Sequence, residues 1–212
     1  MKYILTITGA SGSGKDSLVD ALLVSYGVVN PADVKNIAGS YKATQLEKQI
    51  SVRELVSHTT RAPRTGEVDG VDYYYIDFDT FKTIEKVEET EYAGNHYCLS
   101  ADELRNIPNY GVGIVVVDQH GVECIDKFVR EHSDEFIRLS VFLKITEDVS
   151  RERMLSRGDK PESIEKRITQ QIERHEYEPR HPELYSGILD ASTEASFADN
   201  VAFVIDMLNK RV

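Results

Sequence analysis

Residues 3 to 18 read YILTITGASGSGKDSL, and the architecture expected for the chain follows from this stretch. An apolar run rich in β-branched residues, at 3–7, predicts a buried strand. A glycine-rich turn ending in Lys15 comes next, followed by a helical pattern with apolar positions at Leu18 and Leu22. Strand, glycine-rich turn and helix in this order form the context in which a P-loop, a phosphate-binding turn, is expected.

The residue types of this turn suit phosphate. Glycines permit positive φ angles and let backbone N–H groups approach phosphate oxygens closely. The start of the helix adds unpartnered N–H donors, and Lys15 adds a mobile charge for the β- and γ-phosphates. An ordinary Gly/Ser-rich connection is the alternative, which the lysine and its flanking elements disfavour. We therefore expect ATP to be bound by Gly9, Ala10, Ser11, Gly12, Ser13, Gly14, Lys15, Asp16 and Ser17.

One position departs from the usual pattern. The hydroxyl residue that normally follows the lysine and binds Mg²⁺ is replaced by Asp16, and Ser17 comes one place later. A carboxylate beside a triphosphate needs a cation between them. Mg²⁺ is therefore the expected cofactor, and the sequence leaves open which of these two residues holds it.

The composition is that of a globular protein with one substantial core. The chain has 212 residues, of which 41% are hydrophobic and 29% charged. Its net charge of −11 argues against a nucleic-acid binder, so an anionic substrate must be captured by a local arginine cluster. Cys98 and Cys124 are far apart and predict free thiols in a reducing, cytoplasmic setting. No stretch approaches a membrane span in length, and the oligomeric state, monomer or homodimer, stays open.

Strands and helices alternate along the remaining chain. Buried strands are predicted at 113–117 and 137–145, and helices at 121–132 and 147–157. The pattern predicts an α/β fold, a doubly wound parallel sheet. Asp118 ends the first of these strands, where such folds bind ligands and where carboxylates hold Mg²⁺ through water; a helix-capping role is equally compatible. We assign to packing the apolar face of the last helix: Phe197, Val201, Val204, Ile205 and Leu208.

A second informative stretch, residues 57–75, reads SHTTRAPRTGEVDGVDYYY. Arg61 and Arg64 are separated by a proline that stiffens the loop. Two planar guanidinium groups held in this way suit bidentate binding of a phosphate. The tyrosines at 73–75 add hydroxyl donors on a predicted strand. Two loop arginines alone are usually solvated surface charges, so the interpretation depends on the whole segment.

This segment resembles, nearly residue for residue, the nucleotide-monophosphate-binding segment of guanylate kinases. GASGSGKDSL is similar to the first motif of that family, and residues 153–158 and 162–168 resemble its lid and the helix behind it. The resemblance implies a P-loop fold with one guanylate kinase-like domain. Its expected parts are a core of residues 1–50 and 108–212, a small inserted monophosphate-binding subdomain near 57–107 and a lid near 157–163. We assign no chemistry to residues 28–50.

The resemblance also implies acceptor-binding residues. Those that match phosphate ligands are Arg61, Arg64, Tyr73 and Tyr97, and those that match readers of the guanine edge are Ser57 and Glu91. Among the common bases, only guanine presents N1–H and N2–H side by side, and one carboxylate can accept from both. The pattern alone makes the acidic run EKVEETE around Glu91 a solvated surface.

Several positions depart from the family pattern. The chain between Glu91 and the following glycine is shorter than usual, and residues 98–99, Cys-Leu, replace Gly-Ser/Thr. Ser100 is a candidate to supply the missing hydroxyl. Val116 replaces the first acid of an Asp-x-Asp pair, which leaves Asp118 as a candidate for acceptor and metal binding.

Arginines flank a helix break farther along. Arg153 and Arg157 are four residues apart and share a face of one predicted helix, and Arg167 lies on a second helix expected to begin at Ser163. Arginines on both sides of a Gly-Asp-Lys-Pro break suit a hinged lid that brings positive charge over a transferring phosphate. Each arginine alone is best explained by pairing with a nearby glutamate. Together, at the spacing of the family, they imply the catalytic set Lys15, Arg153, Arg157 and Arg167.

The sequence therefore predicts a kinase that transfers the γ-phosphoryl group of Mg·ATP to a nucleoside monophosphate, GMP or dGMP. Another acceptor is the first alternative, either a different (deoxy)nucleoside monophosphate or ribose 1,5-bisphosphate, because GKDSL also resembles the P-loop of ribose 1,5-bisphosphate phosphokinases. A non-catalytic interaction module of the same fold is the second. Such modules typically lose the P-loop lysine and the lid arginines, and both are present here.

Overall fold

The computed structural model describes residues 1–30, 34, 50–92 and 94–212, so most of the segment at 28–50 lies outside the described residues. Its main sheet has five strands, and every neighbouring pair is parallel. The strand order across the sheet is β2 (Val52–Glu54), β7 (Val112–Val116), β1 (Lys2–Gly9), β8 (Phe136–Lys144) and β9 (Gly187–Asp190). The strands predicted at 3–7, 113–117 and 137–145 correspond to β1, β7 and β8.

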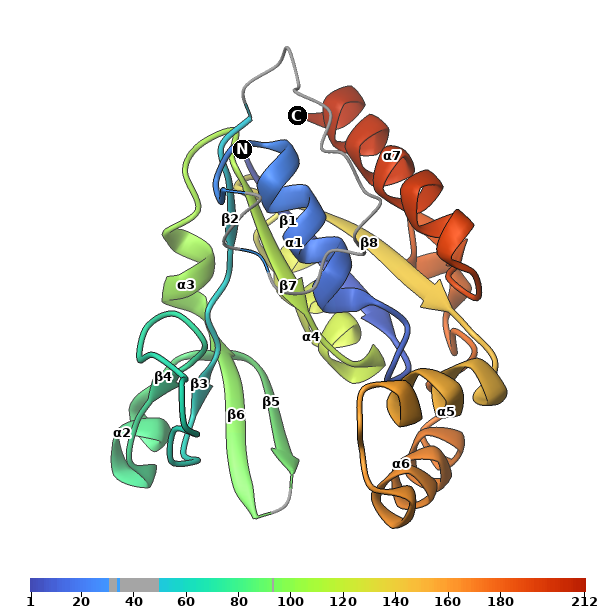
Figure 1. The fold of residues 1–212 in the computed structure, drawn as a ribbon. Coiled ribbons are helices and arrows are strands. Elements are labelled where there is room, and N and C mark those ends of the chain that lie inside the picture. Colours follow the sequence, from blue (N-terminus) through green and yellow to red (C-terminus); the bar gives the residue numbers. More distant parts are fainter. Residues whose placement is uncertain (31–33, 35–49, 93) are drawn as a thin grey trace.

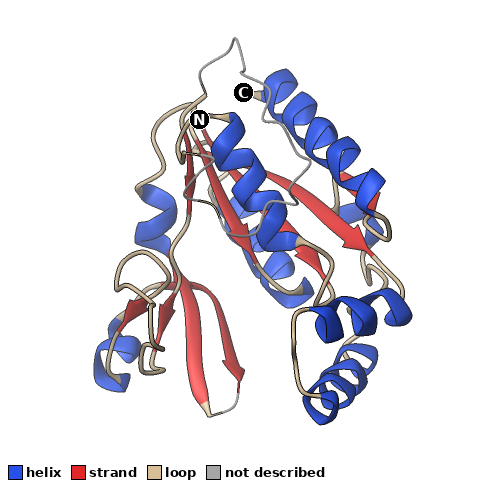
Figure 2. Ribbon diagram, viewed as in Figure 1, coloured by secondary structure: helices blue, strands red, loops and turns tan. Residues whose placement is uncertain are grey.

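Helices cover both faces of this sheet (Figures 1 and 2). Leu5 and Ile7 of β1 join the core cluster that includes α1 (Lys15–Ser25) and α7 (Glu194–Arg211). Ile4, which precedes Leu5, points the other way, into a cluster with α3 (Ala101–Arg105) and α4 (Gln119–Glu131). Alternation along a strand buried on both faces produces this three-layer arrangement. The α/β, doubly wound prediction is confirmed.

A second, smaller sheet follows β2 in the chain. Its strand order is β4 (Tyr74–Tyr75), β3 (His58–Thr59), β6 (Asn95–Ser100) and β5 (Lys86–Tyr92), with the short helix α2 (Phe78–Thr83) beside it. Two residues that fall within the range expected for the inserted subdomain, Leu104 and Ile107, instead pack against the main sheet. The sequence could not separate them from the subdomain, because α3 follows β6 without a break.

A pair of helices, α5 (Glu147–Ser156) and α6 (Pro161–Glu173), lies across from the small sheet at the carboxyl ends of the main strands (Figure 1). Met154, Ile164 and Ile168 form the apolar contact between them. The second helix begins at Pro161 rather than at Ser163, because proline at the first helical position is already set to the helical φ angle. A short 3₁₀ turn, η2 (Pro182–Leu184), then leads to β9. Among the described residues, no helix combines the length and apolar character needed to cross a membrane.

Candidate active site

The P-loop connects β1 to α1 and presents a bare helix start. Gly14 caps α1 at φ 87°, and no side chain accepts a hydrogen bond from the first N–H groups of the helix. At the other end of the loop, Gly9 has a φ of 151°, and a Cβ there would lie 2.4 Å from the carbonyl oxygen of Leu143. Glycine is therefore required for the close passage of the loop beside β8. The open N–H groups and the helix dipole make the loop an anion site.

Lys15 reaches back over the loop. Its Nζ donates to the carbonyl oxygens of Gly9, at 2.7 Å, and Ala10, at 3.0 Å. Burial lowers the pKa of this ammonium group, and the nearby carboxylates of Asp16 and Glu176 partly oppose that effect. The carbonyl contacts hold the charge in place above the phosphate cradle.

Helix α5 braces the P-loop from the side. The Ser150 hydroxyl donates to the carbonyl oxygen of Ser11 at 2.7 Å, and Nη1 of Arg153 donates to that of Gly12 at 2.9 Å. Arg153, predicted to neutralise the transferring phosphoryl group, thus also supports the loop that binds the nucleotide. Two side chains from one helix fix two consecutive carbonyl groups that point away from the phosphate side.

A cavity of about 400 Å³ adjoins the P-loop. Residues 11–18, together with Arg153 and Arg157, form one side of it. The opposite wall comes from the segment after β9 and from α7, and consists of Ala191, Thr193, Glu194, Phe197 and Asn200. The sequence analysis missed this wall; Phe197 packs against the core, as expected, and also lines the cavity. The signal available was the place of these residues just beyond a strand end, where ligands bind in such sheets.

A second, more open groove of about 570 Å³ lies between the small sheet and the α5–α6 pair. Its lining brings Arg64 from the segment after β3 opposite Arg157 and Arg167 of the lid. Arg157 lines both this groove and the cavity at the P-loop. The two spaces are therefore joined at a guanidinium group.

The lid arginines share one internal counter-ion, Asp159. Arg157 donates to it from Nε at 3.0 Å and from Nη2 at 2.5 Å, and Nη1 of Arg167 lies 3.4 Å from Oδ2. The hydrogen bonds from Arg157 lower the pKa of the Asp159 carboxyl. Two cations are thus held side by side by one carboxylate.

Arg61 is held in a different way. Its guanidinium group forms two 2.9 Å hydrogen bonds with the carboxylate of Glu67, which also accepts from the Tyr75 hydroxyl and the Arg64 backbone N–H. These donors, Arg61 first, lower the pKa of Glu67 to about 2. The guanidinium carbon also lies 5.4 Å from the ring centre of Tyr73. Arg61 therefore has a fixed orientation, while Arg64 is exposed in the groove.

Three residues predicted to bind the acceptor phosphate come together here. The rings of Tyr73 and Tyr97 have centroids 5.9 Å apart, and Tyr97 shares a hydrogen bond with Arg61. Tyr73, which directly precedes β4, and Tyr97, on β6, thus form one cluster with Arg61, as the resemblance implied. Ser57 precedes β3, is half-buried, and accepts from the Tyr74 backbone N–H through its own carbonyl oxygen.

Two carboxylates of β5, Glu88 and Glu91, differ in burial and in the face of the small sheet that they occupy. Glu91 is exposed and lies opposite His96, whereas Glu88 lies opposite Leu99, two residues from Tyr97. Because side chains alternate along a strand, Glu88 shares the face of Tyr97 and Glu91 has the other face. Glu88 is only 9% exposed, and burial, followed by the charge of Asp118, raises its pKa to about 7. Glu91, the predicted reader of the guanine edge, thus lies on the side of the small sheet away from Tyr97.

Two further candidates serve as helix caps. The Ser100 hydroxyl accepts from the backbone N–H of Glu103 at 3.2 Å and is buried, so it does not replace the missing hydroxyl of the family. The Asp118 carboxylate accepts from the backbone N–H of Gly121 at 2.8 Å and begins α4. Capping, the alternative noted for Asp118, is therefore present.

The three candidate magnesium residues do not all lie at the P-loop cavity. Asp16 and Ser17 line the cavity at the P-loop, and Asp118 is not among its lining residues. No group of three or more His, Cys, Asp or Glu side chains in the described part of the chain could hold a metal ion. A metal at this site would thus need oxygen ligands from a bound nucleotide or water as well.

Comparison with known proteins agrees with this geometry. The guanylate kinase family model matches residues 42–210, which include the small sheet and the lid but not the P-loop. The guanylate kinase of Thiobacillus denitrificans is 34% identical over 168 residues, covering 76% of this chain and 67% of that protein. That of Pseudomonas syringae is 31% identical, covering 78% and 71%.

A solved structure shares the fold. The crystal structure of guanylate kinase from Anaplasma phagocytophilum superposes with a TM-score of 0.56 at 20% identity, covering 99% of this chain and 85% of that one. The family match spans most of the chain and includes the residues that form the arginine groove. The chain belongs to the guanylate kinase family.

Proposed function

We propose that this protein transfers the γ-phosphoryl group of ATP to GMP or dGMP. One observation carries the proposal: Arg157 lines both the P-loop cavity and the groove in which Arg64 faces the lid. A donor triphosphate in the first space and an acceptor phosphate in the second would meet at this guanidinium group. Positioning and charge neutralisation are the main requirements of phosphoryl transfer.

On the donor side, the P-loop N–H groups and Lys15 bind the β- and γ-phosphates. Lys15 must then exchange its present carbonyl contacts for phosphate oxygens. Arg157 and Arg167 leave Asp159 and stabilise the negative charge on the transferring group, while Arg153 holds the loop. Closure of the groove excludes water, which strengthens each of these interactions.

On the acceptor side, Arg64 is the accessible phosphate ligand, and Tyr73, Tyr97 and the oriented Arg61 complete the phosphate site. Glu88 takes the role that the sequence analysis gave to Glu91. Its carboxylate, once ionised, accepts from both guanine donors, N1–H and N2–H. A charge-assisted pair of this kind gains strength in a buried site.

Mg²⁺ fits the oxygen donors at the start of α1. Asp16 and Ser17 offer a carboxylate and a hydroxyl beside the phosphate cradle, and such hard oxygen ligands suit this ion when phosphates complete its shell. When bound, the ion would neutralise phosphate charge. We infer a cytoplasmic location, which the free thiols of Cys98 and Cys124 support.

The test is an ADP-release assay with Mg·ATP and a panel of acceptors: GMP, dGMP, AMP, dTMP, CMP, UMP and ribose 1,5-bisphosphate. Selective turnover of GMP and dGMP is expected, with a loss of orders of magnitude in kcat for Lys15→Ala. A second candidate, a kinase for another acceptor, is favoured by one feature: Leu99 stands where the family has a hydroxyl, and Ser100 is used as a cap. Turnover of another acceptor alone would establish that candidate. Silence across the panel, with nucleotide still bound, would indicate a non-catalytic module.

A further inference from the structure

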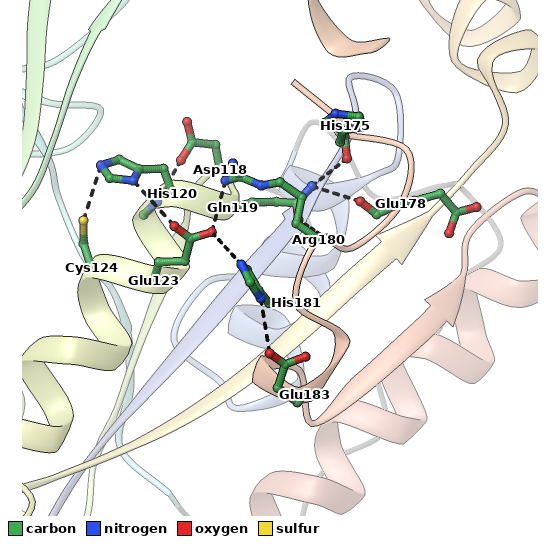
Figure 3. Close-up of polar contacts among 11 residues, drawn as sticks. Asp118, Gln119, His120, Glu123, Cys124, His175, Glu178, Arg180, His181 and Glu183 are labelled. Atoms are coloured by element: carbon green, nitrogen blue, oxygen red, sulfur yellow. Dashed lines mark hydrogen bonds and ion pairs between the residues drawn. The ribbon is translucent and has the colours of Figure 1, made fainter. Parts of the chain in front are cut away.

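The side chain of Gln119 makes an unusual set of contacts with the chain that follows the lid. Gln119 is 4% exposed and comes directly after the cap residue of α4. Its Nε2 donates to the carbonyl oxygens of His175, at 2.6 Å, and Glu178, at 3.0 Å. Its Oε1 accepts from the backbone N–H of Arg180 at 2.7 Å. Figure 3 draws this side chain with those partners.

All three partners belong to residues 174–181, which we call the return segment because it leads from α6 back to the main sheet. Two carbonyl groups require the amide nitrogen, and one N–H requires the oxygen, so the partners fix the orientation of the amide. The amide thus satisfies three backbone groups with one buried side chain. Leaving a buried polar group unpaired is costly, so this arrangement favours one conformation of the segment.

The return segment contains a turn that needs such support. His175 has a φ of 56°, in the left-handed region that residues other than glycine rarely adopt. Its carbonyl oxygen is the group that receives the 2.6 Å hydrogen bond from Gln119. A backbone conformation of this kind persists where surrounding contacts determine it.

The segment is coupled to the lid through Tyr177. The ring of Tyr177 packs against the cluster of Met154, Ile164 and Ile168 that joins α5 to α6. Its hydroxyl donates to Oε1 of Gln171, on α6, at 2.9 Å. Gln119, the return segment and the lid helices therefore form a continuous set of contacts from α4 to the arginine groove.

The segment also carries a carboxylate toward the P-loop. Glu176 is half-buried, and its charge acts on Lys15, whose pKa it raises. Burial raises the pKa of Glu176, and the charge of Lys15 partly opposes this effect. The position of this carboxylate is set by the same backbone that Gln119 holds.

We propose that Gln119 is a positioning residue for phosphoryl transfer, whose carboxamide fixes the return segment and thereby the placement of α6 with Arg167 and of Glu176 beside Lys15. The inference rests on the proposed kinase function. Gln119 touches neither nucleotide. Its proposed role is to align the groups that do. A misplacement of about 1 Å in such groups can lower a rate by about 10²-fold.

A second, exposed set of contacts between α4 and the same segment offers a matched control. Oε1 of Glu123 forms an ion pair with Nη2 of Arg180 at 3.2 Å and lies 3.9 Å from Nε2 of His181 (Figure 3). These side chains are 34–54% exposed, and exposed ion pairs of this kind contribute little to stability. Glu123→Gln removes the charge and leaves the buried amide contacts intact.

The experiment compares Gln119→Ala, Gln119→Glu and Glu123→Gln with the wild type in steady-state assays. Gln119→Glu keeps the shape but turns an oxygen toward two carbonyl groups. We expect both Gln119 variants to lose at least about tenfold in kcat while KM for GMP stays within about threefold, since the small sheet is unchanged. Glu123→Gln should stay within about twofold of the wild type. Circular dichroism checks that each variant is folded.

Hydrogen exchange gives a readout independent of activity. In both Gln119 variants, amides of residues 161–181 should exchange faster, while those of β1 and α1 keep the wild-type rates. Folded Gln119 variants with wild-type kcat and exchange would overturn the proposal, as would a uniform rise in exchange over the whole chain. If Gln119→Ala does not fold, the isosteric Gln119→Glu decides by the same two readouts. An inactive wild type would overturn the kinase function instead, and exchange would still report on positioning.

Discussion

Glu88 and Glu91 stand three positions apart on β5, and this spacing gives their carboxylates opposite sides of the small sheet. Only the side of Glu88 carries Tyr97, whose ring meets Tyr73 in the phosphate cluster. The burial of Glu88 keeps water away from a base-reading carboxylate, which an exposed glutamate cannot do.

Glu88→Gln should therefore weaken recognition of GMP. The amide cannot accept from both guanine donors, and the loss of charge-assisted hydrogen bonds of about 1.5–3 kcal/mol corresponds to a rise in KM for GMP of about 10- to 100-fold. Glu91→Gln, the matched control, should leave KM within about twofold. Steady-state kinetics at saturating ATP measure both. A larger effect at Glu91 than at Glu88 would restore the original assignment.

The raised pKa of Glu88, about 7, predicts a pH dependence for the same step. Guanine binds the ionised form, so below pH 7 the carboxyl must lose a proton on binding, and KM for GMP should rise by up to about tenfold per pH unit. Burial also makes the folded protein hold this proton above the unfolded value, so the contribution of Glu88 to stability falls as pH rises from about 4.5 through 7. Glu88→Gln retains the titration of the GMP phosphate, and its profile should be flatter. Identical profiles would contradict the role of Glu88.

Residue types alone indicated much of this site. The segment at 57–75 predicted Arg61, Arg64 and Tyr73 as phosphate ligands; the structure places Arg61 against the ring of Tyr73 and Arg64 in the groove, and their role toward phosphate stays a prediction. The sequence could not distinguish Glu88 from Glu91, because matching a run of four glutamates without the strand register cannot tell which face each one occupies. Ser100 was misassigned although Ser-x-x-Glu, with Glu103 three residues on, is the pattern of a helix cap.

At the scale of elements, β1, the P-loop and α1 form a unit whose shape depends on Gly9. A Cβ on this residue would meet the Leu143 carbonyl oxygen at 2.4 Å and Oγ of Ser13 at 2.9 Å. Helix α5 supports the same loop through Ser150 and Arg153. The loop thus has little freedom to move away from β8.

Gly9→Ala should consequently weaken ATP binding at least about tenfold and lower the free energy of unfolding. Two effects contribute to these losses: the clash of the new Cβ with β8, and the strain of a positive φ, which costs about 1–3 kcal/mol. Gly27→Ala is the control, since Gly27 has a φ of 70° and a Cβ there meets nothing within 4 Å. Calorimetric titration with ATP and urea unfolding measure the two effects. Equal losses in both variants would show that strain, not the approach to β8, is responsible.

The order and type of the elements followed well from periodicity, since buried strands such as β8 and amphipathic helices such as α4 have distinct patterns. Boundaries were less certain where a cap or a proline decided them, as at Pro161. The place of Thr193, Glu194 and Phe197 just beyond a strand end was a signal for a ligand site, but that they line the same cavity as the P-loop could not be predicted. Its position beside the P-loop depends on β9 lying one strand beyond β8, and strand order is a property of the folded sheet.

At the scale of the whole molecule, two groups of elements lie on either side of the arginine groove, with the small sheet on one side and α5–α6 on the other (Figure 1). Arginine side chains from the two sides face one another across the groove, although the protein as a whole has a net charge of −11. Phosphates bound between the two sides would replace repulsion with attraction from both.

We expect the protein to become more compact when GMP and a non-hydrolysable ATP analogue bind together. Small-angle X-ray scattering should show a smaller radius of gyration with both ligands than with neither. Arg64→Ala removes the cation on the small-sheet side and should reduce the change, while Arg130→Ala, an exposed arginine on α4, should not. An unchanged radius in the wild type, with both ligands shown to be bound, would contradict closure.

Asp159, the carboxylate that joins Arg157 to Arg167, has a consequence for the cell's consumption of ATP. While Asp159 occupies both guanidinium groups, the charge that would assist attack by water on the γ-phosphorus is already neutralised. Only an acceptor whose own phosphate enters the groove offers the two arginines an anion that can replace Asp159. A single aspartate can thus restrain futile ATP hydrolysis during the wait between productive encounters.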